Sequence, residues 1–238
     1  MLVVGHGTPT VVLESGLGAA IGAWALVQPR IQAFTSVIAY DRAGYGLSDS
    51  PMKTPRSSDD IALDLHAGLH AAGIPPPYIL VGHSMGGFYI RSFAHQFPSE
   101  LAGLVFMDPS AEGWVETLRT QFPQVYQNMM AKEASEPEPL KSEIAGRQAS
   151  EDQMRAAWPL PDVPVALLTA IQFQPDGSEA KIYQEWYKAH QEFLDRVKFG
   201  THLVATNSDH NIQFDQPGLV VNTISNLVMS VRSQSRRR

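Results

Sequence analysis

The sequence of 238 residues contains no cysteine. Such a chain can form no disulfide, use no thiol as a nucleophile and bind no metal through sulfur, and its compartment is left open. It also lacks an excess of positive charge, because its net charge is −6 and its only basic cluster is the tail Arg236-Arg237-Arg238. We therefore do not expect nucleic acid to be its main partner.

Long apolar runs are absent as well. No stretch reaches the length of a transmembrane helix, and the N-terminus lacks the charged and apolar regions of a secretory signal. We therefore expect a soluble, cytoplasmic protein without a membrane span. Hydrophobic residues make up 44% of the chain and charged residues 18%, an ordinary globular balance, and the length suits one domain.

Short apolar runs rich in strand-forming residues alternate with helical patterns along the chain. The expected strands are 1–4, 10–15, 36–40, 78–82, 101–107, 164–170 and 201–207. The expected helices are 20–33, 57–72, 85–97, 179–198 and 217–231. This alternation, with strands that are apolar throughout, predicts an α/β fold with a mainly parallel sheet and helices on both faces. The first two strands are expected to form a hairpin that adds an antiparallel edge.

One segment, 111–160, is too long for a simple crossover between two strands. It carries aromatic residues and methionines mixed with acids and prolines. We interpret it as a helical lid inserted into a core that consists of 1–110 and 161–238. Such residues above the C-terminal edge of the sheet suit an apolar substrate, and Trp114 and Met129 are our candidates for substrate binding. The alternative is that these helices only pack against the core.

The stretch "VGHSMGG" at 81–87 places a serine between glycines. The apolar run "YILVG" precedes the serine, and the helical pattern "MGGFYIRSFAHQF" follows it. Strand, sharp turn and helix are the context of a nucleophile elbow, with Ser84 at the turn. A strained turn leaves no room for side chains beside the serine, which explains Gly82 and Gly86. The alternative is a tight turn without a chemical role.

A serine nucleophile needs a base, and His210 is our candidate among the eight histidines. It lies in "NSDHNIQFDQP", after the last expected strand and before a terminal helix that Asp215 could cap. Loops that follow strands at this edge of a sheet carry function in many α/β proteins. His83, inside the elbow itself, is expected to point away from the partners of Ser84.

A second feature of the histidines is the pair His66 and His70, four residues apart within one expected helix. Such a pair can contribute two ligands to a metal ion, but no third ligand is evident in the sequence. We interpret the pair as part of a solvated or half-buried helix face, and we expect neither a metal nor a cofactor.

The chain resembles the serine hydrolases of the α/β-hydrolase fold, in particular their small, lidded, esterase-like group. The resemblance is carried by "ESGLG" (14–18), "YDRAGYGLSD" (40–49), "GIPPPYILVGHSMGGFYIRSFAHQFP" (73–98), "LVFMDPSAEG" (104–113) and "SDHNIQFDQP" (208–217). The catalytic residues of that family follow the chain order serine, acid, histidine, and Ser84 before His210 fits this order. Compared with the family, the first strand at "MLVVGHG" looks shortened or missing.

The resemblance implies hydrolysis of an apolar small-molecule carboxylic ester through a Ser-His-Asp triad and an acyl-enzyme. The backbone amides of Leu17 and Met85 would form the oxyanion hole. The chain departs from the family at two positions: Ser15-Gly16 stands where His-Gly is frequent, and Asp209 stands where glycine commonly precedes the histidine. A backbone donor tolerates the first change, whereas the charge of Asp209 would favour the imidazolium form of His210.

Asp108 and Asp176 compete for the role of the triad acid. Asp108 directly follows the strand 101–107, so it should emerge at the edge that bears Ser84, although it could also be a helix N-cap. Most members of the fold place the acid after the strand that here corresponds to 164–170, which favours Asp176. However, "QPDG" is also a strong turn signature, and we therefore predict Asp108.

The same scaffold hosts several chemistries, so other functions stay open. A lactonase, an amidase or peptidase, and a hydroxynitrile lyase are alternatives to an esterase. From another class of protein, a ligand receptor with a vestigial triad would share these motifs. A serine rather than an aspartate at the elbow argues against a dehalogenase or an epoxide hydrolase.

Overall fold

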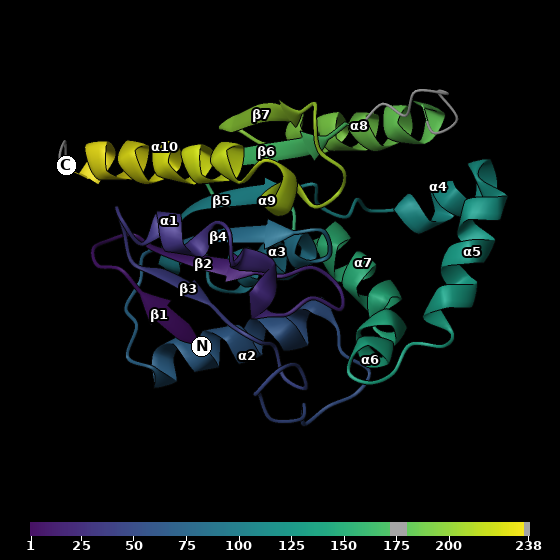
Figure 1. Ribbon diagram of the computed structural model, residues 1–238, viewed down its shortest axis with the longest axis horizontal. Coiled ribbons are helices and arrows are strands. Elements are labelled where there is room, and N and C mark those ends of the chain that lie inside the picture. The colour runs from purple at the N-terminus through teal and green to yellow at the C-terminus, as the bar shows by residue number, and fades with distance from the viewer. Residues whose placement is uncertain (172–179, 236–238) are drawn as a thin grey trace.

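A seven-stranded sheet forms the centre of the molecule in the computed structural model, which describes residues 1–171 and 180–235. The strands lie in the order β1-β3-β2-β4-β5-β6-β7 (Figure 1). Their bounds are β1 (Leu2–Val4), β2 (Thr10–Glu14), β3 (Val37–Ala39), β4 (Tyr78–His83), β5 (Leu101–Met107), β6 (Val165–Ala170) and β7 (Gly200–Ala205). The predicted α/β fold with a mainly parallel sheet is confirmed, since only β1 runs antiparallel to its neighbour.

The expected hairpin between the first two strands is wrong, although the antiparallel edge exists. β1 pairs with β3, with Val3 opposite Ile38, whereas β2 lies on the other side of β3. The physical reason is that all five residues of β2 are buried, so this strand takes a central place between β3 and β4. The connection runs through Gly5 and Gly7, whose φ angles of 76° and 106° are easily adopted only by glycine.

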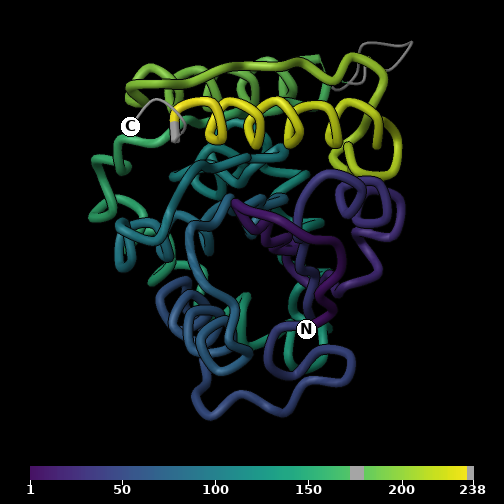
Figure 2. Tube along the Cα trace, turned by 90° about the vertical axis from the view of Figure 1, so that its left-hand side faces the viewer, coloured from purple at the N-terminus to yellow at the C-terminus, as the bar shows by residue number. Residues whose placement is uncertain are grey.

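Helices cover both faces of the sheet. Alternate strand residues, such as Val11 and Leu13, pack against the short helices η1 (Ile21–Trp24), α1 (Gln28–Ile31) and α9 (Ile212–Asp215) and against α10 (Pro217–Ser235). The intervening residues, such as Val12, pack against α2 (Ser58–Ala71), α3 (Gly86–Gln96) and α8 (Ala180–Leu194). Figure 2 shows α10 (yellow) above the strands and α2 (blue) below them.

Four helices follow one another between β5 and β6, within the segment for which an insertion is predicted. They are α4 (Trp114–Gln121), α5 (Pro123–Glu133), α6 (Leu140–Ala145) and α7 (Arg147–Ala156). In Figure 1 they lie beside the end of the sheet toward which β4, β5 and β6 point. We call 111–160 the insertion; its action as a lid stays a prediction. Within the described residues, no helix is both long and apolar enough to cross a lipid bilayer.

Candidate active site

Ser84 lies on the sharp turn between β4 and α3, where the sequence predicts it. Its φ of 53° is in the left-handed region, which is unfavourable for a residue with a side chain. The turn is fixed by the Ser84 amide, which donates to the Met107 carbonyl (3.1 Å). A Cβ atom on Gly86 would lie 2.5 Å from the Glu14 carbonyl oxygen, so glycine is required there. The turn therefore keeps a strained geometry that displays the serine.

His210 and Asp108 are brought together across the C-terminal edge of the sheet. His210 Nδ1 donates a hydrogen bond to Asp108 Oδ2 at 2.6 Å. The His210 side chain is 45% exposed, whereas that of Asp108 is 4% exposed. This bond fixes the tautomer, because Nδ1 carries the proton and Nε2 of neutral His210 is left as an acceptor. The competing candidate Asp176 lies outside the described residues.

The second oxygen of the Asp108 carboxylate is also fully engaged. Oδ1 accepts hydrogen bonds from the Ala170 amide and from Trp186 Nε1, both at 2.9 Å. Burial raises the pKa of Asp108, but the hydrogen bond and charge of His210 and the hydrogen bond from the Ala170 amide hold it below its usual value. Asp108 is therefore an ionised carboxylate held in one orientation.

The expectation that His83 points away from the partners of Ser84 is wrong. His83 Nε2 donates to the backbone carbonyl of His210 at 2.8 Å, and the two rings lie 4.7 Å apart. Burial, followed by the charge of His210, lowers the pKa of His83 to about 4. His83 is thus a neutral donor that ties the elbow to the loop carrying His210. His83 is the buried last residue of β4, so its ring cannot turn out into solvent.

Two further residues near Asp108 carry no signal in the sequence. Trp186 and His190 both come from α8, which packs along the loop that follows β5. His190 is buried; its Nε2 donates to the Pro109 carbonyl at 2.8 Å, and its Nδ1 accepts from Thr169 Oγ1 at 2.8 Å. Burial lowers the pKa of His190, which keeps it neutral in this role. Only the tertiary packing of α8 assigns these side chains to the Asp108 loop.

The loop before His210 is held by Asp215, which the sequence suggested as a helix cap. Asp215 Oδ2 accepts from Ser208 Oγ (3.1 Å) and from the Asp209 amide (3.0 Å). Asp209, for its part, accepts from the Asn211 amide through Oδ1 at 2.7 Å. The two aspartates therefore shape the turn on which His210 is presented, and the Asp209 side chain is exposed.

The residues of the two predicted oxyanion donors lie beside Ser84. Leu17 and Met85 both line one cavity with Ser84, and within the described chain neither amide donates to a protein acceptor. A Cβ atom on Gly16 would lie 3.0 Å from Ser84 Cβ, which shows how closely this loop approaches the serine. Arg42 holds the loop in place by donating to the carbonyls of Ser15 (2.7 Å) and Gly16 (2.9 Å).

Arg42 is the centre of a buried ionic cluster that the sequence does not reveal. It pairs with Glu14 at the end of β2 and with Glu143 in α6, both at 2.8 Å. Burial disfavours the charge of Arg42, but the two carboxylates more than compensate and raise its pKa well above the usual value. Burial also raises the pKa of Glu14, which accepts a further hydrogen bond from Tyr40. The cluster joins the sheet, the Gly16 loop and the insertion.

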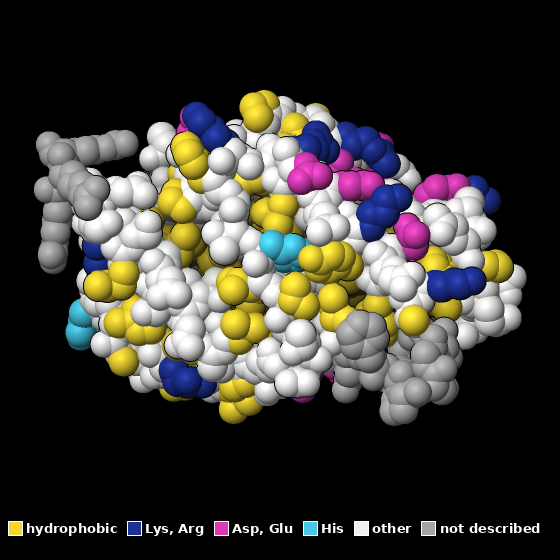
Figure 3. All heavy atoms as spheres, turned by 90° about the horizontal axis from the view of Figure 1, so that it is seen from above, with side chains coloured by type: hydrophobic (Ala, Val, Ile, Leu, Met, Phe, Trp, Pro, Cys, Tyr) yellow, Lys and Arg dark blue, Asp and Glu magenta, His cyan; other side chains and the backbone are white. Residues whose placement is uncertain are grey.

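Two cavities meet at Ser84. The larger, of about 360 Å³, is lined by Ser84, Asp108, Ser110, Trp114, Ile182, Tyr183, Trp186 and His210. The smaller, of about 170 Å³, has a mainly apolar lining that includes Leu17, Met85, Phe88, Trp114, Val115 and Met129. Both predicted substrate residues, Trp114 and Met129, therefore line a cavity at Ser84. Figure 3 shows the molecule from above, where hydrophobic side chains (yellow) are scattered among polar ones.

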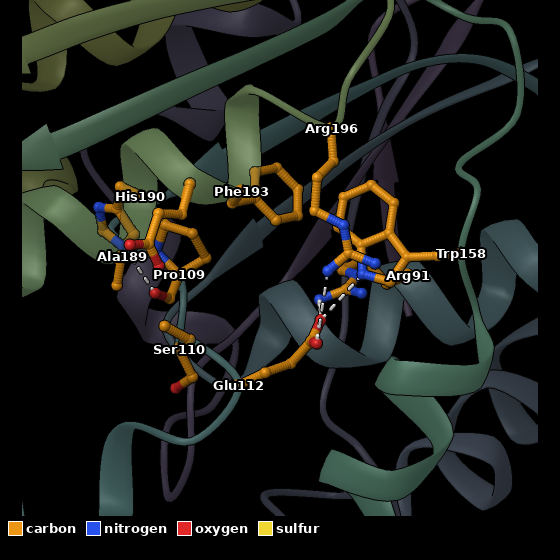
Figure 4. A pocket seen from close by; sticks show the side chains of 11 residues that line it. Arg91, Pro109, Ser110, Glu112, Trp158, Ala189, His190, Phe193 and Arg196 are labelled. Carbon is orange, nitrogen blue, oxygen red and sulfur yellow. Dashed lines mark hydrogen bonds and ion pairs between the residues drawn. The ribbon is translucent and has the colours of Figure 1, made fainter. Parts of the chain in front are cut away.

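A third cavity, of about 210 Å³, lies behind the loop that follows Asp108 (Figure 4). Arg91 and Arg196 both face Glu112, with N–O distances of 2.6 Å and 3.8 Å. Trp158 donates to Glu112 at 3.1 Å and lies under the Arg196 guanidinium. This ionic cluster links α3, the turn after α8 and the insertion, and neither Ser84 nor His210 lines the cavity.

The sequence profile of the alpha/beta hydrolase fold matches residues 9–144, which is more than half of the chain. The chain belongs to the alpha/beta hydrolase family. This hydrolase is 27% identical over 218 residues to the uncharacterized protein YqjL of Bacillus subtilis, a match that covers 89% of this chain and 80% of YqjL. The other curated relatives compared are covered over 17% to 39% of their own length.

Two solved structures show how widely the fold of this hydrolase is shared. An esterase from Thermogutta terrifontis superposes with a TM-score of 0.63 at 19% identity, covering 97% of this chain and 92% of the esterase. An enol-lactonase from Burkholderia xenovorans superposes with a TM-score of 0.64 at 14% identity, covering 96% and 95% of the two chains. At these identities the likeness is one of fold.

Proposed function

We propose that this hydrolase cleaves carboxylic esters, with Ser84 as the nucleophile, His210 as the general base and Asp108 as the carboxylate that orients His210. The observation that carries the proposal is the 2.6 Å hydrogen bond from His210 Nδ1 to Asp108 Oδ2, formed beside a cavity that Ser84 also lines. A histidine held in this tautomer beside a serine on a strained turn supports nucleophilic acyl transfer.

In the proposed reaction, Ser84 Oγ attacks the acyl carbonyl while His210 Nε2 takes the hydroxyl proton. The Leu17 and Met85 amides stabilise the resulting oxyanion, a contribution of about 3 kcal/mol for a single donor in a known case. His210 then gives its proton to the leaving alcohol as the C–O bond breaks, which leaves an ester between Ser84 and the acyl group. Water, deprotonated by His210, attacks this acyl-enzyme and releases the acid and free Ser84.

The two cavities at Ser84 support an ester with apolar groups on both sides of the reacting bond. Because both cavities include Ser84, one can take the acyl group and the other the alcohol. Trp114 lines both of them, and Met129 lines the smaller one. Since Trp114 and Met129 come from the insertion, we propose that the insertion acts as the lid and selects for apolar groups. The enol-lactonase and the esterase of the same fold are both enzymes that act on acyl–oxygen bonds by name.

The decisive experiment is stopped-flow hydrolysis of p-nitrophenyl acetate and p-nitrophenyl butyrate. The wild type should release a burst of about one p-nitrophenolate per chain, because acylation of Ser84 precedes the slower attack by water. Ser84→Ala should abolish the burst and lower turnover by about 10⁶-fold. Ser135→Ala, which alters an exposed serine in the insertion, is the matched control and should behave like the wild type. Binding of the esters without turnover by the wild type would instead identify a receptor.

A further inference from the structure

The structure supplies the third ligand that the sequence does not show for the histidine pair in α2. His66 and His70 both point Nε2 at Glu100 Oε1, at 3.1 Å and 3.2 Å. Glu100 is the last residue of η2 (Pro98–Glu100), directly before β5. The ligand atoms of the three residues all lie within 4.8 Å of one another. Packing of α2 beside the start of β5 thus brings together residues that are 30 positions apart.

The spacing of these atoms fits a tetrahedral zinc site. Zinc is bound at about 2.0–2.1 Å by histidine nitrogen and at similar distances by carboxylate oxygen, so two ligands of a tetrahedral ion lie about 3.3 Å apart. The Nε2 atoms of His66 and His70 are 3.1 Å and 3.2 Å from Glu100 Oε1, close to that edge. The ligand atoms of the two histidines lie within 4.8 Å of each other, so a zinc ion would be accepted once the rings bring that third distance to about 3.3 Å.

The Glu100 carboxylate has bonding capacity that the protein leaves unused. Oε1 is shared by two imidazole rings, while Oε2 is buried and has no hydrogen-bond partner among the described residues. A buried carboxylate oxygen without a partner is costly, because its interaction with water is lost and not replaced. A cation bound between the three side chains would remove this cost and balance the carboxylate charge.

The site is also ordered and accessible. The His66 ring stacks on Phe97, with centroids 3.6 Å apart and planes 4° apart, which fixes its orientation. The side chains of His66, His70 and Glu100 are 25%, 51% and 17% exposed, so one side of the site is open to solvent. An ion can enter from that side, and water can complete its coordination.

We propose that His66, His70 and Glu100 bind one zinc ion. Two imidazoles and one carboxylate suit Zn²⁺, whereas Mg²⁺ and Ca²⁺ require mainly oxygen ligands. The ion lies far from the chemistry, because β5 begins next to Glu100 and ends next to Asp108, at the opposite edge of the sheet. It joins the C-terminal part of α2 to the start of β5, and its effect is on the stability of the fold.

The test is calorimetric titration of the full chain, freed of metal by a chelator, with ZnCl₂ and with MgCl₂. We expect one Zn²⁺ per chain and no binding of Mg²⁺. His66→Ala, His70→Ala and Glu100→Gln should each weaken zinc binding by about 100-fold or more, since loss of even an outer partner of a metal ligand costs 10–100-fold. His95→Ala, an exposed histidine on α3, should bind zinc as the wild type does.

Thermal unfolding with and without ZnCl₂ gives an independent readout. Zinc should raise the midpoint of the wild type and of His95→Ala, and it should leave that of a His66→Ala/His70→Ala double variant unchanged. The proposal is overturned if the wild type binds no zinc, or if the double variant binds it as tightly as the wild type. Neither result bears on ester hydrolysis, which is measured separately at the other edge of the sheet.

Discussion

Two carboxylates at opposite edges of the sheet each contact histidine, but they use their oxygens differently. Asp108 accepts from a single imidazole, that of His210, and its other oxygen is bonded to Ala170 and Trp186. Glu100 presents one oxygen to two imidazoles, and its other oxygen has no partner among the residues that the structure describes.

The difference separates two roles that the same residue types can take. A carboxylate whose lone pairs are engaged by fixed donors cannot turn, so it can hold one histidine in one tautomer. A carboxylate with an unused oxygen beside two imidazoles presents several electron-pair donors to the same point in space, which is what a cation requires. The partners of each carboxylate, rather than the presence of a histidine beside it, therefore distinguish an orienting pair from a metal site.

For these two carboxylates, the largest expected effect is that of Asp108→Asn, which disrupts the pair of His210 and Asp108. The amide keeps the shape of the side chain but loses its charge, and it can present Nδ2–H to the ring and so favour the wrong tautomer of His210. We expect kcat for p-nitrophenyl acetate to fall by about 10⁴-fold, as in the best-known triad. Asp162→Asn, at an exposed ion pair with Lys198, is the control. Retention of more than a tenth of the activity would transfer the orienting role to another residue such as Asp176.

His83 differs from the histidines above because it donates to a backbone carbonyl and not to a carboxylate. Its pKa of about 4 lies below the usual 6.5, so below pH 6.5 the unfolded chain takes up a proton that the folded chain refuses. The stability that results is complete above pH 6.5 and is lost as the pH falls toward 4. Between pH 7 and pH 5 this single group should lower the free energy of unfolding by about 2 kcal/mol.

His83→Gln tests this pH dependence, because glutamine can donate to the His210 carbonyl but does not titrate. The free energy of unfolding is measured with urea at pH 7 and at pH 5. Its decrease between the two pH values should be about 2 kcal/mol smaller in the variant than in the wild type. If both proteins lose the same free energy over this range, His83 is not the group responsible.

Trp186→Phe removes one of the two hydrogen bonds that Asp108 Oδ1 accepts. Hydrogen bonds to charged groups contribute about 1.5–3 kcal/mol, so we expect kcat to fall by about tenfold or more. Trp158→Phe also removes an indole donor from a carboxylate, Glu112, but outside the cavity at Ser84. Equal kcat values for the two variants would show that the Trp186 donor has no part in holding Asp108.

The smallest expected effect concerns Phe97, which stacks on His66 in the proposed zinc site. Phe97→Leu removes the ring that stacks on His66 and leaves the three proposed ligands in place. Aromatic pairs contribute about 0.5–1.5 kcal/mol, so zinc binding should weaken by about threefold. Phe199→Leu, at an exposed phenylalanine, is the control. A zinc affinity identical to that of the wild type would mean that the stacking does not order His66.

The sequence predicts best what is encoded locally. The apolar runs identify the strands, and the glycines around Ser84 identify the turn, because both signals arise within a few adjacent residues. Asp108 and His210 could be named because each directly follows a strand or its loop, and parallel strands end at one edge. The donors around them could not be named. Trp186 is assigned by the packing of α8, and Glu100 reaches the α2 histidines only because η2 lies beside that helix.

The pairing of β1 illustrates the same limit. Two short apolar runs joined by a glycine-containing turn are typical of a hairpin, yet β1 lies beside β3 because β2 needs a neighbour on each side. The choice between these pairings depends on the number of strands available to the whole sheet, and no short window of sequence contains that information.

The insertion has one half that is anchored by the buried cluster around Arg42 and one half that is mostly exposed. Moving α6 outward would break the buried ion pair between Arg42 and Glu143, and breaking a buried pair costs about 3–5 kcal/mol. α7 is tied down as well, since Ser150 Oγ accepts from the Ser58 amide at 2.9 Å. By contrast, α5 buries none of its residues and α4 buries only Leu118. If the insertion acts as the lid that we propose, a substrate that widens the entrance should displace α4 and α5, whose tie to α7 includes the ion pair between Glu133 and Arg147.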